Sequence, residues 1–119
     1  MNFIAPIAVA LVAALHLYIL VLEMFLWTRP FGMKTFGLTP DRAAVTKVLA
    51  ANQGLYNGFL AAGLIWALAL GVDAGRDIAV FFLGCVVAAG VFGALTASRK
   101  ILIVQGVPGA VALAVVLAT

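Results

Sequence analysis

Residues 47–63 read KVLAANQGLYNGFLAAG, an apolar segment interrupted by four polar side chains. The polar residues are Asn52, Gln53, Tyr56 and Asn57. At about 100° per residue on a helix, they cover roughly 140° of one side. Gly54 and Gly58 fall largely on the other side. A helix with polar side chains on one face and glycines on the other has no face suited to lipid. We therefore expect other helices to pack against both faces.

The composition of the chain indicates a membrane as its solvent. Of its 119 residues, 66% are hydrophobic and 9% are charged, and the mean hydropathy is +1.26. A soluble domain carries about 25% charged residues. A chain of 119 residues also makes too small a core to bury this much apolar surface in water. The sequence therefore predicts an integral membrane protein, with the lipid bilayer as its first partner.

Four apolar runs are long enough to cross a bilayer. The predicted spans are residues 3–27, 48–71, 78–97 and 101–118. The connections at 72–77 and 98–100 are so short that adjacent spans should be antiparallel. We therefore expect an all-α fold in which residues 1–119 form a single transmembrane domain, an up-down-up-down four-helix bundle. Residues 28–47 form its cytoplasmic loop.

This loop also contains the predicted start of the second helix. The residues expected to break any regular periodicity are Pro30, Gly32 and Gly37. The helix should begin near Pro40, because Thr39 can cap it and Asp41 complements the positive end of its dipole. It would then enter the membrane near residue 48.

The Lys and Arg residues predict the orientation, because cytoplasmic loops carry an excess of them. Arg76 is the one basic residue between the second and third spans. The other six lie in the first and third connections or just beside them: Arg29, Lys34, Arg42, Lys47, Arg99 and Lys100. These two connections should face the cytoplasm, with both chain termini outside, in a bacterial inner membrane.

Small residues recur every four positions in three of the spans, which lets helix backbones approach closely. Gly54 and Gly58 mark the row in the second span, Gly93 that in the third and Gly106 that in the fourth. One row could be the seam of a homodimer, and packing within the bundle is the equally ordinary interpretation.

The first span contains two ionisable residues, His16 and Glu23, on one side of a helix. Seven residues separate them, so they lie within roughly 20° of each other and about 10.5 Å apart along the axis. Counting residues from the cytoplasmic ends of the spans places Glu23 at the same membrane depth as Asn52, Gln53 and Gln105. His16 lies deeper in the membrane, at the level of Tyr56 and Asn57. An ionisable group at this depth is costly and by default a functional candidate.

The predicted ligand or proton site comprises Glu23, His16, Asn52, Gln53, Tyr56 and Asn57, with Trp27, Tyr18 and Gln105 as additional lining. In the structural alternative, Glu23 forms a hydrogen bond with the amide of Asn52 or Gln53 that only holds two helices together. No metal site is expected, because one His, one buried Glu and a distant Cys85 do not supply three or four ligands. No catalytic nucleophile with a nearby base, no cofactor motif and no basic face for nucleic acid occurs.

Two stretches, HLYILVLEMFLWTRPFG and FGLTPDRAAVTKVLAANQGLYNGFLAAGL, resemble a family of small membrane proteins known as domain of unknown function 1304. The resemblance covers essentially the whole chain and is strongest over residues 16–63. It implies a four-span fold in a bacterial inner membrane and no particular activity. The matching residues are His16, Tyr18, Glu23, Trp27, Asn52, Gln53, Gly54, Tyr56, Asn57 and Gly58.

Three functions remain open from the residues alone. In the leading hypothesis the chain is a proton-linked small-molecule transporter or ligand-binding bundle, with Glu23 as its titrating or cation-pairing group. In the second, a membrane enzyme or redox accessory subunit binds a lipid or quinone head group near His16 and Tyr56. In the third, the bundle is a structural accessory protein without chemistry of its own.

Overall fold

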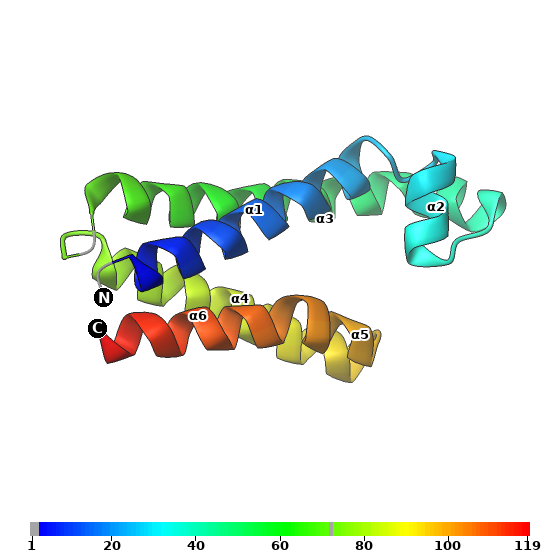
Figure 1. The fold of residues 1–119 in the computed structure, drawn as a ribbon. Coiled ribbons are helices and arrows are strands. Elements are labelled where there is room, and N and C mark those ends of the chain that lie inside the picture. The colour runs from blue at the N-terminus through cyan, green and yellow to red at the C-terminus, as the bar shows by residue number, and fades with distance from the viewer. Residues whose placement is uncertain (1–2, 72) are drawn as a thin grey trace. The chain divides into compact units, whose positions relative to one another are not determined.

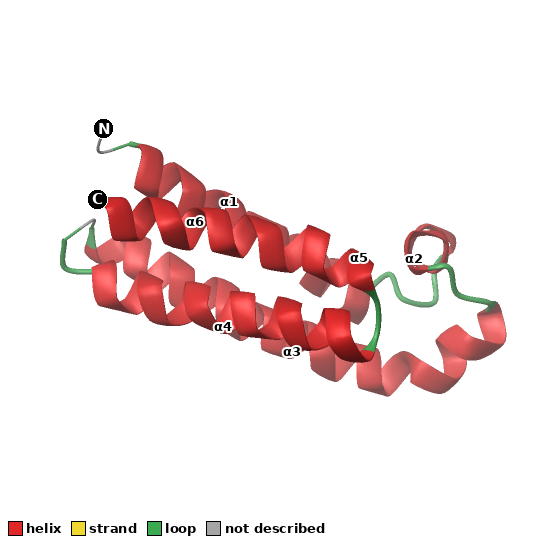
Figure 2. Ribbon diagram, turned by 90° about the horizontal axis from the view of Figure 1, so that it is seen from below, coloured by secondary structure: helices red, strands yellow, loops and turns green. Residues whose placement is uncertain are grey.

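The structure, a computed structural model, describes residues 3–71 and 73–119, and in these residues helices joined by turns and short loops are the only regular elements (Figures 1 and 2). The elements are α1 (Ile4–Met24), α2 (Pro30–Phe36), α3 (Pro40–Leu70), α4 (Arg76–Thr96), α5 (Arg99–Ile101), the π-helical segment η1 (Leu102–Gly106) and α6 (Val107–Ala118). The predicted all-α class is confirmed. The turn expected at 72–77 includes position 72, which lies outside the described residues.

Four helical stretches are long and apolar enough to span a membrane: Ile4–Met24, Pro40–Leu70, Arg76–Thr96 and Arg99–Ala118. With 21 residues, α1 is about 31 Å long, which matches a hydrocarbon core of about 30 Å. With 31 residues, α3 is about 46 Å long. This helix is therefore much longer than one membrane crossing requires.

The extra length of α3 lies at its N-terminal end, which begins as the sequence predicts. Pro40 is the first helical residue, and the hydroxyl of Thr39 accepts a hydrogen bond from the backbone N–H of Arg42 at 3.2 Å. Asp41 lies in the first turn. Each of these satisfies or complements a backbone N–H group that would otherwise be unpaired at a helix start.

The expectation that Pro30, Gly32 and Gly37 break all regular structure is wrong, because Pro30–Phe36 forms the short helix α2. Pro30 occupies the first helical position, where its missing N–H is no loss. Gly37 ends the helix in the left-handed conformation, with φ 65°. Gly32 is buried, and a Cβ there would lie 1.8 Å from the carbonyl oxygen of Leu26. The same residues that indicate a loop thus delimit a helix and let it pack.

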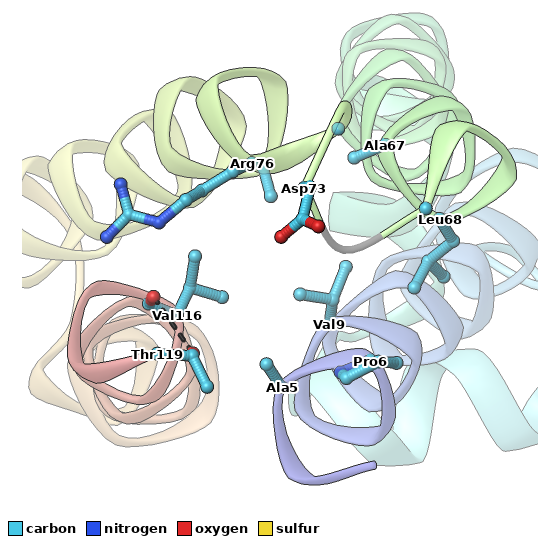
Figure 3. A pocket seen from close by; sticks show the side chains of 12 residues that line it. Ala5, Pro6, Val9, Ala67, Leu68, Asp73, Arg76, Val116 and Thr119 are labelled. Carbon is cyan, nitrogen blue, oxygen red and sulfur yellow. Dashed lines mark hydrogen bonds between the residues drawn. The ribbon is translucent and has the colours of Figure 1, made fainter. Parts of the chain in front are cut away.

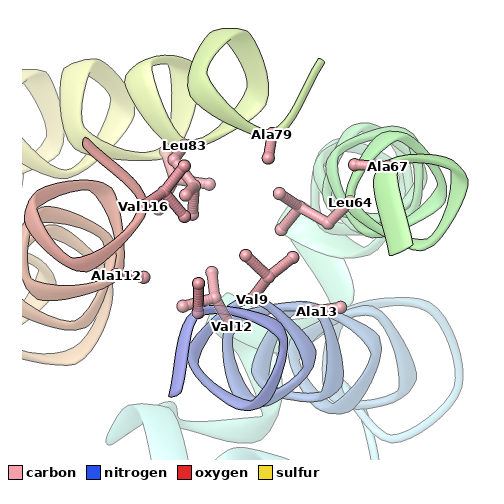
Figure 4. Packing of buried hydrophobic residues seen from close by; sticks show 11 residues of the cluster. Val9, Val12, Ala13, Leu64, Ala67, Ala79, Leu83, Ala112 and Val116 are labelled. Carbon is pink, nitrogen blue, oxygen red and sulfur yellow. The ribbon is translucent and has the colours of Figure 1, made fainter. Parts of the chain in front are cut away.

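The chain forms two compact units, and the larger one consists of residues 1–13 together with 60–119. Its core is an apolar cluster drawn from α1, α3, α4 and α6 (Figure 4). The fully buried members with the largest side chains are Leu64, Leu83 and Val86. Other members shown in Figure 4 are Val9, Val12, Ala13, Ala67, Ala79, Ala112 and Val116.

Within this unit, α4 lies against the last span at glycine contacts. A Cβ on Gly90 would lie 2.5 Å from the Cα of Gly106, and one on Gly109 would lie 2.6 Å from the side chain of Val86. Gly93 faces Ile101 in the same way. The π-helical turn η1 ends two residues before Pro108, whose ring cannot continue a regular hydrogen-bond ladder.

The smaller unit consists of residues 14–59, which are the second half of α1, α2 and the first two-thirds of α3. Glycines again mark the helix contact. A Cβ on Gly54 would lie 2.6 Å from the Met24 side chain, and one on Gly58 would lie 2.7 Å from the Leu20 side chain. The glycine row of α3 therefore packs against α1 of the same chain.

We predict that Gly90→Ala destabilises the fold, because its methyl group would collide with the backbone of Gly106. Overpacking of this kind costs about 1–3 kcal/mol. The matched control is Gly84→Ala on the same helix, where an added Cβ meets nothing within 4 Å. Denaturation by dodecyl sulfate in mixed micelles, followed by circular dichroism, measures both variants. Equal stability of the two variants would contradict the predicted contact.

Candidate functional site

The polar centre of the smaller unit is a hydrogen bond between Asn57 on α3 and Glu23 on α1. The amide Nδ2 of Asn57 donates to Oε1 of Glu23 at 2.7 Å. Asn57 is buried, at 8% exposure, and Glu23 is half-buried. The bond joins residues 34 positions apart in sequence, so it fixes the register of one helix on the other.

This bond depends on the glycines beside it. Gly54 precedes Asn57 by one helical turn, and a Cβ there would lie 3.2 Å from the Cβ of Glu23. Gly58 follows Asn57 directly and faces Leu20. A larger side chain at Gly54 would press on the Cβ of Glu23 and on the carbonyl oxygen of Leu20, 3.3 Å away, and would hold α3 away from α1. At Gly58 it would meet only the flexible end of the Leu20 side chain. Gly54 therefore positions the polar contact.

His16 lies on α1 two turns before Glu23 and is completely buried. The seven-residue separation places the two side chains on one side of α1, about 10.5 Å apart along the axis. A buried imidazole has an acceptor and a donor nitrogen to satisfy. His16 therefore lies on the same side of α1 as the carboxyl group, fully buried within the protein.

The other polar residues of α3 are not part of this contact. Asn52 and Gln53 are exposed, and Tyr56 is 54% exposed, with its ring against that of Phe59. Glu23 was expected to lie level with Asn52 and Gln53, but its partner is Asn57, about one turn further along α3. Tyr18 on α1 is also exposed. Of the four polar side chains in residues 47–63, only Asn57 faces inward.

Trp27 closes the end of α1 rather than touching the carboxyl pair. Its indole Nε1 donates to Oγ1 of Thr46 at 3.0 Å, and its ring lies 4.8 Å from that of Phe36 on α2. Thr46 in turn donates to the carbonyl oxygen of Arg42 at 2.6 Å. Thr46 is a contact residue that the sequence analysis missed, because a lone threonine on an exposed helix carries no pattern.

Gln105, the last predicted lining residue, is half-buried in η1 and belongs to the larger unit. That unit also has a cavity of about 100 Å³ that the sequence analysis did not find (Figure 3). Asp73, Arg76 and Thr119 are polar residues on its wall, and Arg76 Nη2 donates to the carbonyl oxygen of Leu117 at 3.2 Å. The sequence feature that could have indicated this cavity is the pair of charged residues Asp73 and Arg76 beside the start of α4. The sequence analysis treated them only as part of a connection between spans.

The carboxyl group of Glu23 is the ionisable group of this polar contact. Among residues 3–71 and 73–119, no three His, Cys, Asp or Glu side chains lie close enough to hold a metal ion. The carboxyl group of Glu23 accepts one amide hydrogen bond at Oε1. Ionised, a carboxylate has about four acceptor positions on its two oxygens. It can therefore take a proton or an organic cation without giving up its bond to Asn57.

Comparison with known proteins yields a family without an assigned activity. The family model described as "Protein of unknown function (DUF1304)" matches residues 10–117. An uncharacterised protein named YpaA from Lactococcus lactis is 31% identical over 108 residues, which cover 89% of this chain and 90% of that protein. No solved structure matches the chain.

We predict that Asn57→Ala lowers stability by about 0.6–2 kcal/mol, the range for interhelical hydrogen bonds in membranes. Gln53→Ala is the matched control, because its exposed amide should cost little. A double-mutant cycle with Glu23→Ala isolates the bond from packing losses, with mixed-micelle denaturation as the measurement. Strictly additive effects of Asn57→Ala and Glu23→Ala would show that the two side chains do not interact.

Proposed function

Because the chain belongs to the DUF1304 family of proteins of unknown function, we propose its role from its site alone: a small multi-pass membrane protein that binds or transports a small molecule in a proton-linked manner. The observation that carries the proposal is the 2.7 Å hydrogen bond from Asn57 to Glu23. Glu23 is the only glutamate of the chain, and it lies at the end of an otherwise apolar span.

The proposed setting is a bacterial inner membrane crossed four times. The six basic residues of the first and third connections, against one in the second, favour a cytoplasmic location for those two connections. The spans then alternate in direction, with both termini on the other side. In this orientation the Glu23–Asn57 pair lies near the cytoplasmic boundary, since α1 ends at Met24.

A carboxylate at this depth favours exchange over permanent binding. An uncompensated charge is unfavourable by about 2.5–3.5 kcal/mol at the centre of a membrane helix, and by less near its end. Because Glu23 is half-buried near that end, it should carry either a proton or a cationic partner. Asn57 holds the carboxyl group in place in both states, because an amide donor can bond an ionised or a neutral oxygen. A proton and a cation that compete for the same carboxyl group cannot occupy it together, so release of the proton is linked to binding of the cation.

We predict that the Glu23 carboxyl group changes its protonation state when an organic cation binds. Because Glu23 is the only glutamate, ¹³C-glutamate labelling isolates its infrared carboxyl band from those of the aspartates. Protein in nanodiscs, titrated with tetraphenylphosphonium at several pH values, should lose the protonated band as cation is added. A Glu23 band that responds neither to pH nor to the cation would refute the proposed exchange.

Flux measurements test the consequence in proteoliposomes that contain a pH-sensitive dye. Added tetraphenylphosphonium should release protons through the wild-type protein and through Asp41→Asn, an exposed carboxylate used as the control. Glu23→Gln keeps an oxygen for Asn57 but cannot ionise, so its proton release should fall to the level of empty vesicles. Undiminished release by folded Glu23→Gln would exclude this carboxyl group as the coupling site.

A further inference from the structure

The N-terminal part of α3 has two opposed faces over residues 43–59. Ala43, Ala50 and Asn57 recur every seven residues, and all three are buried within the chain, at 0%, 5% and 8% exposure. Gly54 lies on the same face, against α1. This face is fully used by contacts inside the smaller unit.

The opposite face carries a second seven-residue repeat whose side chains are all exposed. Its residues, here called the outer seam, are Val45, Val48, Asn52, Leu55 and Phe59. Written as a heptad with Val45 at position a, they fill consecutive a and d positions. Val45 and Val48 are 85% and 82% exposed. Apolar residues in consecutive a and d positions are the pattern by which two helices pair along a seam.

The N-terminal end of the outer seam extends past the end of α1. The bond between Asn57 and Glu23 places Asn57 level with the last turn of α1, which ends at Met24. Val45 precedes Asn57 by 12 residues, or about 18 Å of helix. Helix α1 therefore does not cover Val45 and Val48. A row of exposed apolar residues along one side of a helix is the kind of surface that binds a protein partner.

Asn52 identifies the partner as a second copy of the chain. It is the one polar residue of the outer seam, at an a position. A carboxamide is both donor and acceptor, so it can pair with the same residue across a two-fold axis. A single Asn at an a position fixes register and favours two strands in parallel coiled coils. Copies inserted with the same orientation present their outer seams in parallel.

We propose that the protein forms a parallel homodimer in which α3 pairs with the α3 of a second copy along the outer seam. The dimer contact is centred on Asn52 facing Asn52 of the second copy. The glycine row of Gly54 and Gly58 is not the dimer seam, because those residues already contact Leu20 and Met24 of their own chain.

Disulfide cross-linking in membranes tests the seam directly. In a Cys85→Ala background, which removes the one native cysteine, Val48→Cys should form an intermolecular disulfide under mild oxidation. Lys47→Cys is the matched control, because it is the adjacent exposed residue and points away from the outer seam. A clear excess of dimer for Val48→Cys is expected. Equal yields, or no dimer for Val48→Cys, would overturn the proposal.

A charge placed at the centre of the seam tests the role of Asn52. Asn52→Lys sets two like charges against each other in the dimer, while Gln53→Lys adds the same charge at an exposed position outside the outer seam. Light scattering in detergent should show a dimer for wild type and Gln53→Lys and a monomer for Asn52→Lys. Circular dichroism of all three verifies that they are folded. A wild-type monomer, or a persistent dimer for folded Asn52→Lys, would refute the proposed contact.

Discussion

The contact between α1 and α3 depends on a constraint that membranes impose. Lipid tails are as apolar as the helices they surround, so burial of apolar surface does not drive helices together there. Close packing and hydrogen bonds must do so instead. Gly54 and Gly58 provide the close approach, and Asn57 uses it to bond Glu23. The contact that joins α1 and α3 in the smaller unit is therefore also the one that holds the carboxyl group of Glu23 in place.

Hydropathy was sufficient to find the four candidate spans, and the Thr39–Pro40 signal was sufficient to find the start of α3. The choice of inward-facing polar residues could not be made in the same way. Periodicity shows which residues share a face but not which face meets a neighbour. Asn52, Gln53 and Tyr56 therefore looked equivalent to Asn57. Gly54 was expected on the side away from all four, but it lies only about 60° from Asn57 around the helix axis and contacts α1 beside it.

Helix α2 could not be predicted from the sequence for a different physical reason. Pro30 and Gly37 break a helix when they stand inside it, but at its first position and just past its end they favour it. Sequence spacing alone does not distinguish seven helical residues between these two from a loop of the same length. Burial of Gly32 against Leu26 makes the difference, and that contact exists only once α1 has ended and the chain has turned back.

The two proposals concern opposite faces of α3 and rest on different residues. The heptad positions of Asn57 and of the outer seam are roughly 140–160° apart around the helix axis. Each Glu23–Asn57 pair is complete within one chain, so a dimer would contribute no residue to it. What pairing would add is restraint on a helix that extends well past the end of α1. Because Asn57 lies on that same helix, the restraint would also hold α3 in register with α1 at the bond to Glu23. Loss of the dimer should therefore weaken this bond without removing any of its atoms.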